Sequence, residues 1–188
     1  MLIGLMSLSG LSARAEMSNW GAHLAYTKVK DASDGNYLWG GHLELALAPF
    51  LGVQGAVDYR SDDKFVTPSG VEGVRVRSVP VTLTGRLYLP GPLPIRPFAE
   101  AGAGWYRVVY DYTRGLEALG LEDQTVTTFG WHTGVGVNVN LAPNLLLTGD
   151  GRYVYADPKR KLDPAVSEQI RNLDYDNINL GVGLSLAF

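Results

Sequence analysis

Apolar and polar side chains alternate along most of this chain, and residues 177–188 show the pattern without interruption. The even positions from Ile178 to Phe188 are apolar, and the odd positions between them are small or polar. Because side chains of a strand point alternately to its two faces, this segment is predicted to be a β-strand. Its apolar face would point inward in a water-soluble barrel and outward in a membrane barrel, so the rest of the chain must decide between them.

Seven segments upstream repeat this alternation, which predicts eight strands in all. They are expected near residues 19–30, 37–48, 52–62, 74–89, 96–112, 125–141, 145–157 and 174–188. Eight is the smallest usual number of strands in a membrane barrel. The pattern therefore predicts an all-β fold with antiparallel up-and-down strands.

The predicted connections alternate between short and long. Short turns are expected at 49–51, 90–94 and 143–144, and longer polar loops at 31–36, 63–73, 113–124 and 158–173. An up-and-down barrel with both termini on one side produces this alternation, with short turns in the periplasm and long loops outside the cell. A β-sandwich gives no reason for it.

Aromatic residues on the apolar parity gather near both ends of the predicted strands. They are Tyr26, Trp39, Tyr59, Trp131 and Tyr155 toward the long loops, and Trp20, Phe50 and Phe188 toward the short turns. Amphipathic rings occupy these levels at the two interfaces of a membrane. This placement favours a transmembrane barrel whose apolar face meets lipid.

The opposite parity is rich in polar and charged side chains. It comprises His23, His42, Glu44, Gln54, Asp58, Arg60, Thr82, Thr84, Arg86, His132, Asn138, Asn140, Asp150, Arg152, Asn177 and Asn179. In a soluble barrel of the lipocalin type, which is the alternative, these charges would surround an apolar ligand at a desolvation cost of several kcal/mol per ion. Paired charges in the lumen of a membrane barrel avoid that cost. We therefore predict an eight-stranded antiparallel up-and-down transmembrane β-barrel.

Two positions depart from the alternation. Pro80 lies within the fourth segment and cannot donate to a strand ladder, so a bulge or local break is expected there. In the fifth segment, placing Glu100 inside sends Trp105 to lipid together with Arg107. Arg107 is expected either to reach toward the lipid headgroups or to be redirected by a bulge.

Composition narrows the class of protein further. No run of eighteen apolar residues exists, which excludes a transmembrane helix and leaves a closed barrel as the only structure that could span a bilayer. The absence of cysteine excludes disulfides and thiolate chemistry.

The N-terminal segment has the features of a secretory signal. Residues 2–11 are apolar or small, and Ala13, Arg14 and Ala15 fit a small-x-small cleavage site before Glu16. No basic residue precedes Leu2, so residues 1–15 are either a truncated signal peptide, which we expect, or a weakly amphipathic N-terminus. Residues 16–188 then form one barrel domain with 15 basic and 19 acidic residues, a net charge of −4 that gives no indication of nucleic-acid binding.

Several stretches resemble the small outer-membrane β-barrel family that includes the OmpA transmembrane domain and the OmpX, OmpW and opacity-type proteins. They are residues 96–105, 134–138 with 143–144 and 152–153, and 181–188. The resemblance implies location among the lipids of the outer membrane of a Gram-negative-type envelope. It also implies insertion by the outer-membrane assembly machinery, with the aromatic strand end at Phe188 as the assembly signal. It does not imply a reaction.

The candidate functional residues all lie on the polar parity. They are Glu44, Asp58, Arg60, Arg86, Glu100, His132, Asp150 and Arg152. An eight-stranded lumen is just wide enough to be filled by side chains, so opposite charges at similar depth should meet and plug it. A structural salt-bridge network is one interpretation, and a gated ion path through the same pairs is another.

The three histidines do not have the close spacing of a metal motif. His23, His42 and His132 are therefore predicted to be hydrogen-bonded side chains of the lumen rather than metal ligands or catalytic bases. Ser61, Asp62 and Asp63 lie at the rim without an outward histidine, so no nucleophile and base converge. We predict no enzymatic activity, no cofactor and no metal.

The predicted role is structural, adhesive or surface-interacting, and the long loops would carry any extracellular ligand. The alternative is porin-like or OmpW-like transport of small molecules, which would need a continuous lumen or a lateral gap between strands. An outer-membrane lipid-modifying enzyme is a third hypothesis and would need a nucleophile and base that the pattern does not provide.

Overall fold

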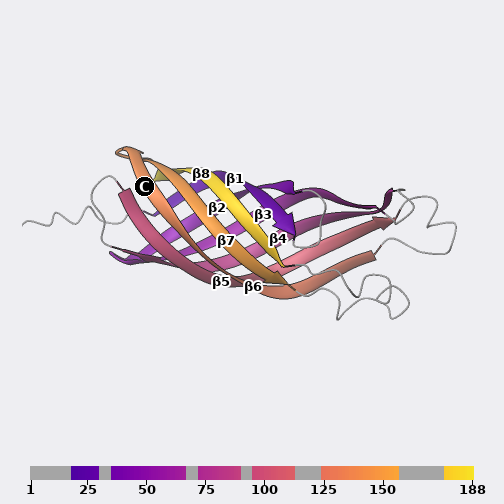
Figure 1. Cartoon of the computed structure of the whole chain (residues 1–188). Coiled ribbons are helices and arrows are strands. Elements are labelled where there is room, and N and C mark those ends of the chain that lie inside the picture. The colour runs from indigo at the N-terminus through magenta and orange to yellow at the C-terminus, as the bar shows by residue number, and fades with distance from the viewer. Residues whose placement is uncertain (1–17, 30–34, 67–71, 90–94, 113–123, 157–175) are drawn as a thin grey trace, which may run out of the picture.

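The computed structural model describes residues 18–29, 35–66, 72–89, 95–112, 124–156 and 176–188 (Figure 1). These ranges contain eight strands. The strands are β1 (Asn19–Val29), β2 (Asn36–Ala48), β3 (Leu51–Val66), β4 (Glu72–Tyr88), β5 (Ile95–Tyr112), β6 (Gln124–Ala142), β7 (Leu145–Ala156) and β8 (Asn177–Ala187). The predicted signal peptide, residues 1–15, lies outside the described residues.

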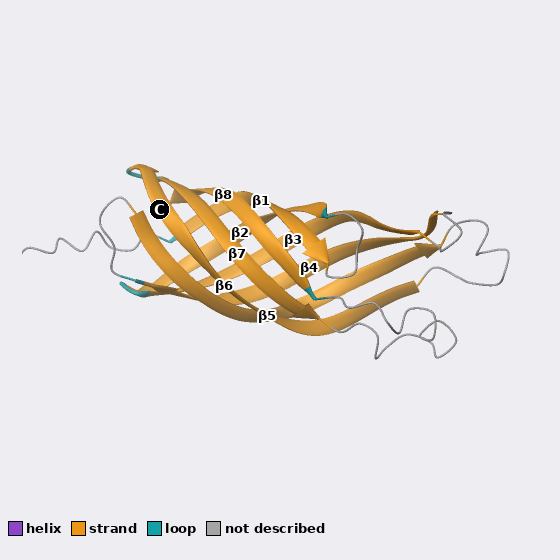
Figure 2. Ribbon diagram, in the orientation of Figure 1, coloured by secondary structure: helices purple, strands orange, loops and turns teal. Residues whose placement is uncertain are grey.

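Every strand pairs antiparallel with its neighbours in sequence, and β1 pairs with β8 to close the barrel (Figure 2). The closing register runs from Asn19 opposite Ala187 to Val29 opposite Asn177. The predicted eight-stranded antiparallel barrel is therefore confirmed. Within the described residues, no helix is long and apolar enough to cross a bilayer.

The strands differ in length around the barrel. Strands β3 to β6 have 16 to 19 residues, whereas β1, β2, β7 and β8 have 11 to 13. The extra length lies at the end opposite the chain terminus, where the β3–β4 and β5–β6 arms project (Figure 1). The expected loop at 63–73 is wrong, because β3 continues to Val66 and β4 begins at Glu72. Charged residues interrupt the apolar alternation of the sequence there, so the pattern does not indicate a strand.

The apolar parity faces outward and the polar parity faces the lumen. Leu83 and Leu180 are 60% and 62% exposed, whereas Glu44 and Arg86 are 3% and 4% exposed. This polarity is that of a membrane barrel and is opposite to that of a lipocalin-type barrel.

Outward aromatic rings pair across neighbouring strands near the end from which the β3–β4 and β5–β6 arms project. The ring centroids of Trp39 and Tyr59 are 5.6 Å apart, and those of Trp131 and Tyr155 are 5.5 Å apart. Near the other end, Trp20, Phe50 and Phe188 are all more than half exposed. Two aromatic belts thus border the apolar band, at the levels that the alternation predicted.

The predictions for Pro80 and Arg107, the two positions that depart from the alternation, have different outcomes. The β3–β4 ladder pairs Val57 with Val81, resumes only at Arg60 with Ser78, and then shifts register before Asp63, which confirms the irregularity expected at Pro80. Arg107 stays outward and exposed, in unbroken register between Val79 and Thr127. The alternative of a bulge that would turn Arg107 inward is therefore wrong.

Candidate functional site in the barrel lumen

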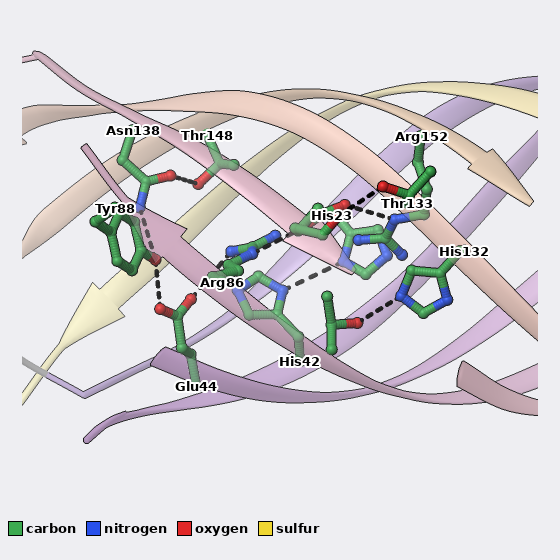
Figure 3. Close-up of polar contacts among 12 residues, drawn as sticks. His23, His42, Glu44, Arg86, Tyr88, His132, Thr133, Asn138, Thr148 and Arg152 are labelled. Atoms are coloured by element: carbon green, nitrogen blue, oxygen red, sulfur yellow. Dashed lines mark hydrogen bonds and ion pairs between the residues drawn. The ribbon is translucent and has the colours of Figure 1, made fainter. Parts of the chain in front are cut away.

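An ion-pair network crosses the lumen from four strands. Arg86 on β4 donates from Nη1 to Oε2 of Glu44 on β2 and from Nε to Oε2 of Glu100 on β5. The donor–acceptor distance is 3.0 Å in each bond. Arg152 on β7 donates from Nε to the other oxygen of Glu100 over 2.7 Å (Figure 3). Two guanidinium groups and two carboxylates therefore alternate across the barrel, and each Arg86 contact is buried.

The network continues toward the short turns through uncharged groups. Tyr88 donates its hydroxyl hydrogen to Oε1 of Glu44, and Asn138 donates from Nδ2 to the Tyr88 hydroxyl over 3.4 Å (Figure 3). Thr148 donates to Oδ1 of Asn138 over 2.9 Å. The centroid of the Phe98 ring lies 4.6 Å from Cζ of Arg86, and Phe98 is 2% exposed, so a buried aromatic side chain lies beside the ion pairs.

Two of the contacts between alternate strands pass over a glycine on the strand between them. Gly134 on β6 is paired with both Glu100 and Arg152, and an added Cβ there would lie 3.1 Å from Oε1 of Glu100. Gly102 on β5 is paired with Thr84 and His132 in the same way, and an added Cβ would lie 2.6 Å from Nε2 of His132. We call such positions bridged glycines, because two side chains meet over their bare backbone.

The other predicted site residues have separate surroundings. His132 lies 2.8 Å from the Thr84 hydroxyl through Nε2, and Asp58 lies 2.7 Å from Nε2 of His23. Asp150 lines a lumen cavity with Arg86 and Arg152 but is within ion-pair distance of neither. Arg60 lines a second cavity farther toward the long loops. The eight predicted site residues therefore do not form a single network. The ion pairs connect four of them, Glu44, Arg86, Glu100 and Arg152.

The lumen space beside this network is small. The two cavities have volumes of about 30 Å³ each and share Leu38, Asp58, Arg152 and Asn179 in their linings. Such volumes hold water molecules rather than an organic solute. Among the residues that the structure describes, no three His, Asp or Glu side chains gather as a metal ion would require.

Sequence reasoning missed three parts of the lumen. Tyr88 and Phe98 are buried aromatic residues of the interior, although both share the inward parity of Arg86 and Glu100. Ser185 was assigned only to a small, polar face, yet its hydroxyl contacts His42. The bridged glycines could have been used for prediction, since a glycine on the inward face leaves room for side chains of the two adjacent strands to contact each other.

The comparison with protein families decides the identity of this barrel. The family model described as "Outer membrane protein beta-barrel domain" matches residues 1–188. The chain belongs to this outer-membrane β-barrel family. The resemblance drawn from the strand motifs is therefore confirmed, and the protein is located in the outer membrane. No curated protein sequence matches the chain.

Solved outer-membrane barrels share the fold at low sequence identity. Neisserial surface protein A is 14% identical with a TM-score of 0.63, over 91% of this chain and 96% of that one. OprG from Pseudomonas aeruginosa is 13% identical with a TM-score of 0.63, over 92% and 97%. Ail of Yersinia pestis, in complex with the heparin analogue sucrose octasulfate, is 11% identical with a TM-score of 0.57, over 92% and 97%. At these identities the likeness concerns the fold alone.

Proposed function

We propose that this outer-membrane barrel is closed to solutes and serves as a structural or surface-interaction protein without enzymatic activity. The observation that supports closure is the connected chain Glu44–Arg86–Glu100–Arg152, which takes one side chain from each of β2, β4, β5 and β7. A side-chain plug of this kind fills an eight-stranded lumen.

The energetics of the ion pairs favour a permanently closed lumen rather than a gated ion path. Swinging Arg86 out of the lumen would leave the carboxylates of Glu44 and Glu100 with one guanidinium between them. Separating a buried charge from its partner costs about 3–5 kcal/mol, which corresponds to an open fraction of roughly one in a hundred or less. A gated ion path through these pairs therefore has less support than a structural plug.

The exterior end of the barrel supports a role in surface interaction. Strand β3 continues past the aromatic belt residue Tyr59 to Val66, and β5 continues past Trp105 to Tyr112. The ends of these strands therefore lie beyond the aromatic belt, and the segments that follow them in sequence are our candidates for contact with extracellular ligands. Ail, which shares the fold, has been solved with a sulfated sugar bound. We propose that the present barrel likewise offers its extracellular side to a ligand.

An enzymatic role has less support than the surface role. The Ser185 hydroxyl lies 3.0 Å from Nε2 of His42, a nucleophile–base distance. Ser185 is only 2% exposed, however, and it lines neither of the two lumen cavities. A substrate would have no route to its oxygen.

Solute entry into proteoliposomes separates the closed barrel from a transporter. Liposomes carrying the protein are diluted into isotonic arabinose, and swelling is followed by light scattering. The closed barrel predicts the swelling rate of protein-free liposomes, and faster swelling at equal protein insertion would favour transport. Arg107→Gln is the matched control, because Arg107 is exposed on the outward face and should not alter the lumen.

The surface role is tested by replacing residues 113–123 and 157–175 with short glycine–serine turns. Both segments connect strands at the extracellular end, so the barrel should still insert. Proteoliposomes carrying either protein are then passed over a heparin surface. We expect retention of the unaltered barrel and its loss in the short-loop variant. Equal retention would contradict a role for these connections.

A further inference from the structure

Four lumen side chains form an unbroken polar chain along β8, β1, β2 and β3. The Ser185 hydroxyl lies 3.0 Å from Nε2 of His42, and Nδ1 of His42 lies 3.2 Å from Nδ1 of His23 (the histidine pair is drawn in Figure 3). Nε2 of His23 lies 2.7 Å from Oδ1 of Asp58, which is 4% exposed. This chain shares no residue with the plug of Glu44, Arg86, Glu100 and Arg152.

Two further bridged glycines make the chain possible. Gly21 on β1 is paired with both Ser185 and His42, and an added Cβ would lie 2.6 Å from the Ser185 hydroxyl oxygen. Gly40 on β2 is paired with both His23 and Asp58, and an added Cβ would overlap Oδ1 of Asp58. The backbone thus leaves room for both outer contacts, so the chain is a built feature of the lumen.

Hydrogen-bonding rules fix the direction of the chain when both histidines are neutral. Nε2 of His23 lies at ion-pair distance from Oδ1 of Asp58, and a ring nitrogen so close to an ionised carboxylate carries its hydrogen, so Nδ1 of His23 is an acceptor. His42 must then donate from Nδ1, which leaves its Nε2 as the acceptor for the Ser185 hydroxyl. The two rings are therefore opposite tautomers, and both hydrogen bonds point from Ser185 toward His23, whose Nε2 lies at ion-pair distance from Asp58.

The two facing nitrogens hold a proton rather than a metal ion. The ring centroids are 5.5 Å apart, which is the 3.2 Å separation of the Nδ1 atoms plus one ring radius on either side. The nitrogens therefore point at each other head-on, along the line of an N–H···N hydrogen bond. Two histidines that share a tetrahedral metal ion would instead aim their lone pairs at a point beside that line.

The groups around the pair include a counter-charge for one added proton. The charged groups that line the same cavity are Asp58 from β3, Arg86 from β4, and Asp150 and Arg152 from β7. The uncharged polar groups around the pair are Gln54, Thr148, Asn179 and Ser185. Arg86 and Arg152 are already balanced by Glu44 and Glu100. Among the described residues, no ion pair joins a guanidinium to Asp58 or Asp150, so these two carboxylates place negative charge beside His23.

We propose that His23 and His42 form a binding site for a single proton in the barrel lumen. A proton taken from cavity water ends on Nε2 of His42, while the hydrogen between the rings moves from Nδ1 of His42 to Nδ1 of His23. Ser185 keeps its hydrogen and becomes the acceptor, so the Ser185–His42 and His42–His23 contacts persist with reversed direction while Nε2–H of His23 still faces Asp58. The positive charge lies on His23 against Asp58. A second proton would set two N–H groups head-on and break the contact between the rings.

Nitrogen NMR of the folded barrel in detergent micelles tests this proposal. At neutral pH we expect His23 to be the Nε2–H tautomer and His42 the Nδ1–H tautomer, with a through-hydrogen-bond coupling between their Nδ1 atoms. On acidification the pair should gain one proton with the coupling retained, and the coupling should vanish when the second proton binds. His132 is the internal control, since its Nε2 faces the Thr84 hydroxyl and no second histidine.

Two variants separate the proton site from a merely structural chain. Asp58→Asn removes the counter-charge, so the ratio of charged to neutral pairs at a fixed pH should fall by about tenfold or more. Asp150→Asn keeps the chain and should retain both tautomers and the coupling. The proposal is overturned if both rings are the same tautomer, if the coupling is absent at neutral pH, or if two protons bind with the coupling intact. The wild-type spectrum decides these points even if Asp58→Asn does not fold.

Discussion

Arg152 on β7 and Glu100 on β5 form an ion pair of 2.7 Å although β6 lies between their strands. Their side chains meet over Gly134, whose backbone is paired with both residues. An added Cβ at this position would lie 2.6 Å from the carbonyl oxygen of Gly151 as well as 3.1 Å from Glu100. The Arg152–Glu100 contact of the plug therefore depends on a residue that makes no polar side-chain contact itself.

Replacing that glycine should weaken the barrel. Gly134→Ala forces a methyl group against the Gly151 carbonyl and the Glu100 carboxylate, so we expect a loss of about 1–3 kcal/mol in the free energy of unfolding. Urea unfolding in detergent micelles, followed by tryptophan fluorescence, measures this loss. Gly55→Ala is the matched control, because Gly55 faces outward and an added Cβ there meets nothing within 4 Å. Equal losses in both variants would contradict the bridging role of Gly134.

Removing Arg86 alone should cost more than removing it together with Glu44. Arg86→Met leaves Glu44 as a buried carboxylate without its guanidinium partner, and we expect a loss of about 3–5 kcal/mol in the free energy of unfolding. Adding Glu44→Gln removes that charge and leaves the Arg152–Glu100 pair balanced. The double variant should therefore recover a large part of the loss. If it is as unstable as Arg86→Met, the ion-pair account of the plug is wrong.

The hydroxyl group of Tyr88, as well as its ring, should contribute to the stability of the barrel. Tyr88→Phe leaves Oε1 of Glu44 without its donor and Nδ2 of Asn138 without its acceptor. We expect a loss of about 1–3 kcal/mol in the free energy of unfolding, because buried polar groups lose their partners. Tyr155→Phe keeps its ring contact with Trp131 on the outward face and should change stability by less than about 0.5 kcal/mol. A loss in Tyr155→Phe as large as that in Tyr88→Phe would contradict this explanation.

The positions of the tryptophans give a test of orientation in the bilayer. All four face outward, with Trp20 near the short turns and Trp39, Trp105 and Trp131 near the long-loop end. In single-tryptophan variants, brominated lipids should quench each of them most strongly when the bromine lies close to the headgroup. A water-soluble quencher added outside oriented proteoliposomes should distinguish Trp20 from the other three. Strongest quenching from the bilayer centre would contradict the two aromatic belts.

The alternation of side chains was sufficient to predict the strands, their closure and the facing of the polar residues. It did not predict which charges meet, because strand parity fixes a side and not the register between strands. Asp150 and Arg86 share the inward face, yet among the described residues it is Glu44 and Glu100 that lie within ion-pair distance of Arg86. The end of β3 was missed for another reason, since its last residues lie beyond the apolar band that creates the alternation.

Recording from planar lipid bilayers tests the closed lumen most directly. The wild-type barrel is compared with a variant that combines Arg86→Ala and Arg152→Ala with Glu44→Gln and Glu100→Gln, which opens the plug without leaving buried carboxylates unpaired. A closed lumen predicts no discrete conductance for the wild type and channel currents for the variant at equal insertion. Steady wild-type channels that the four substitutions leave unchanged would contradict the account.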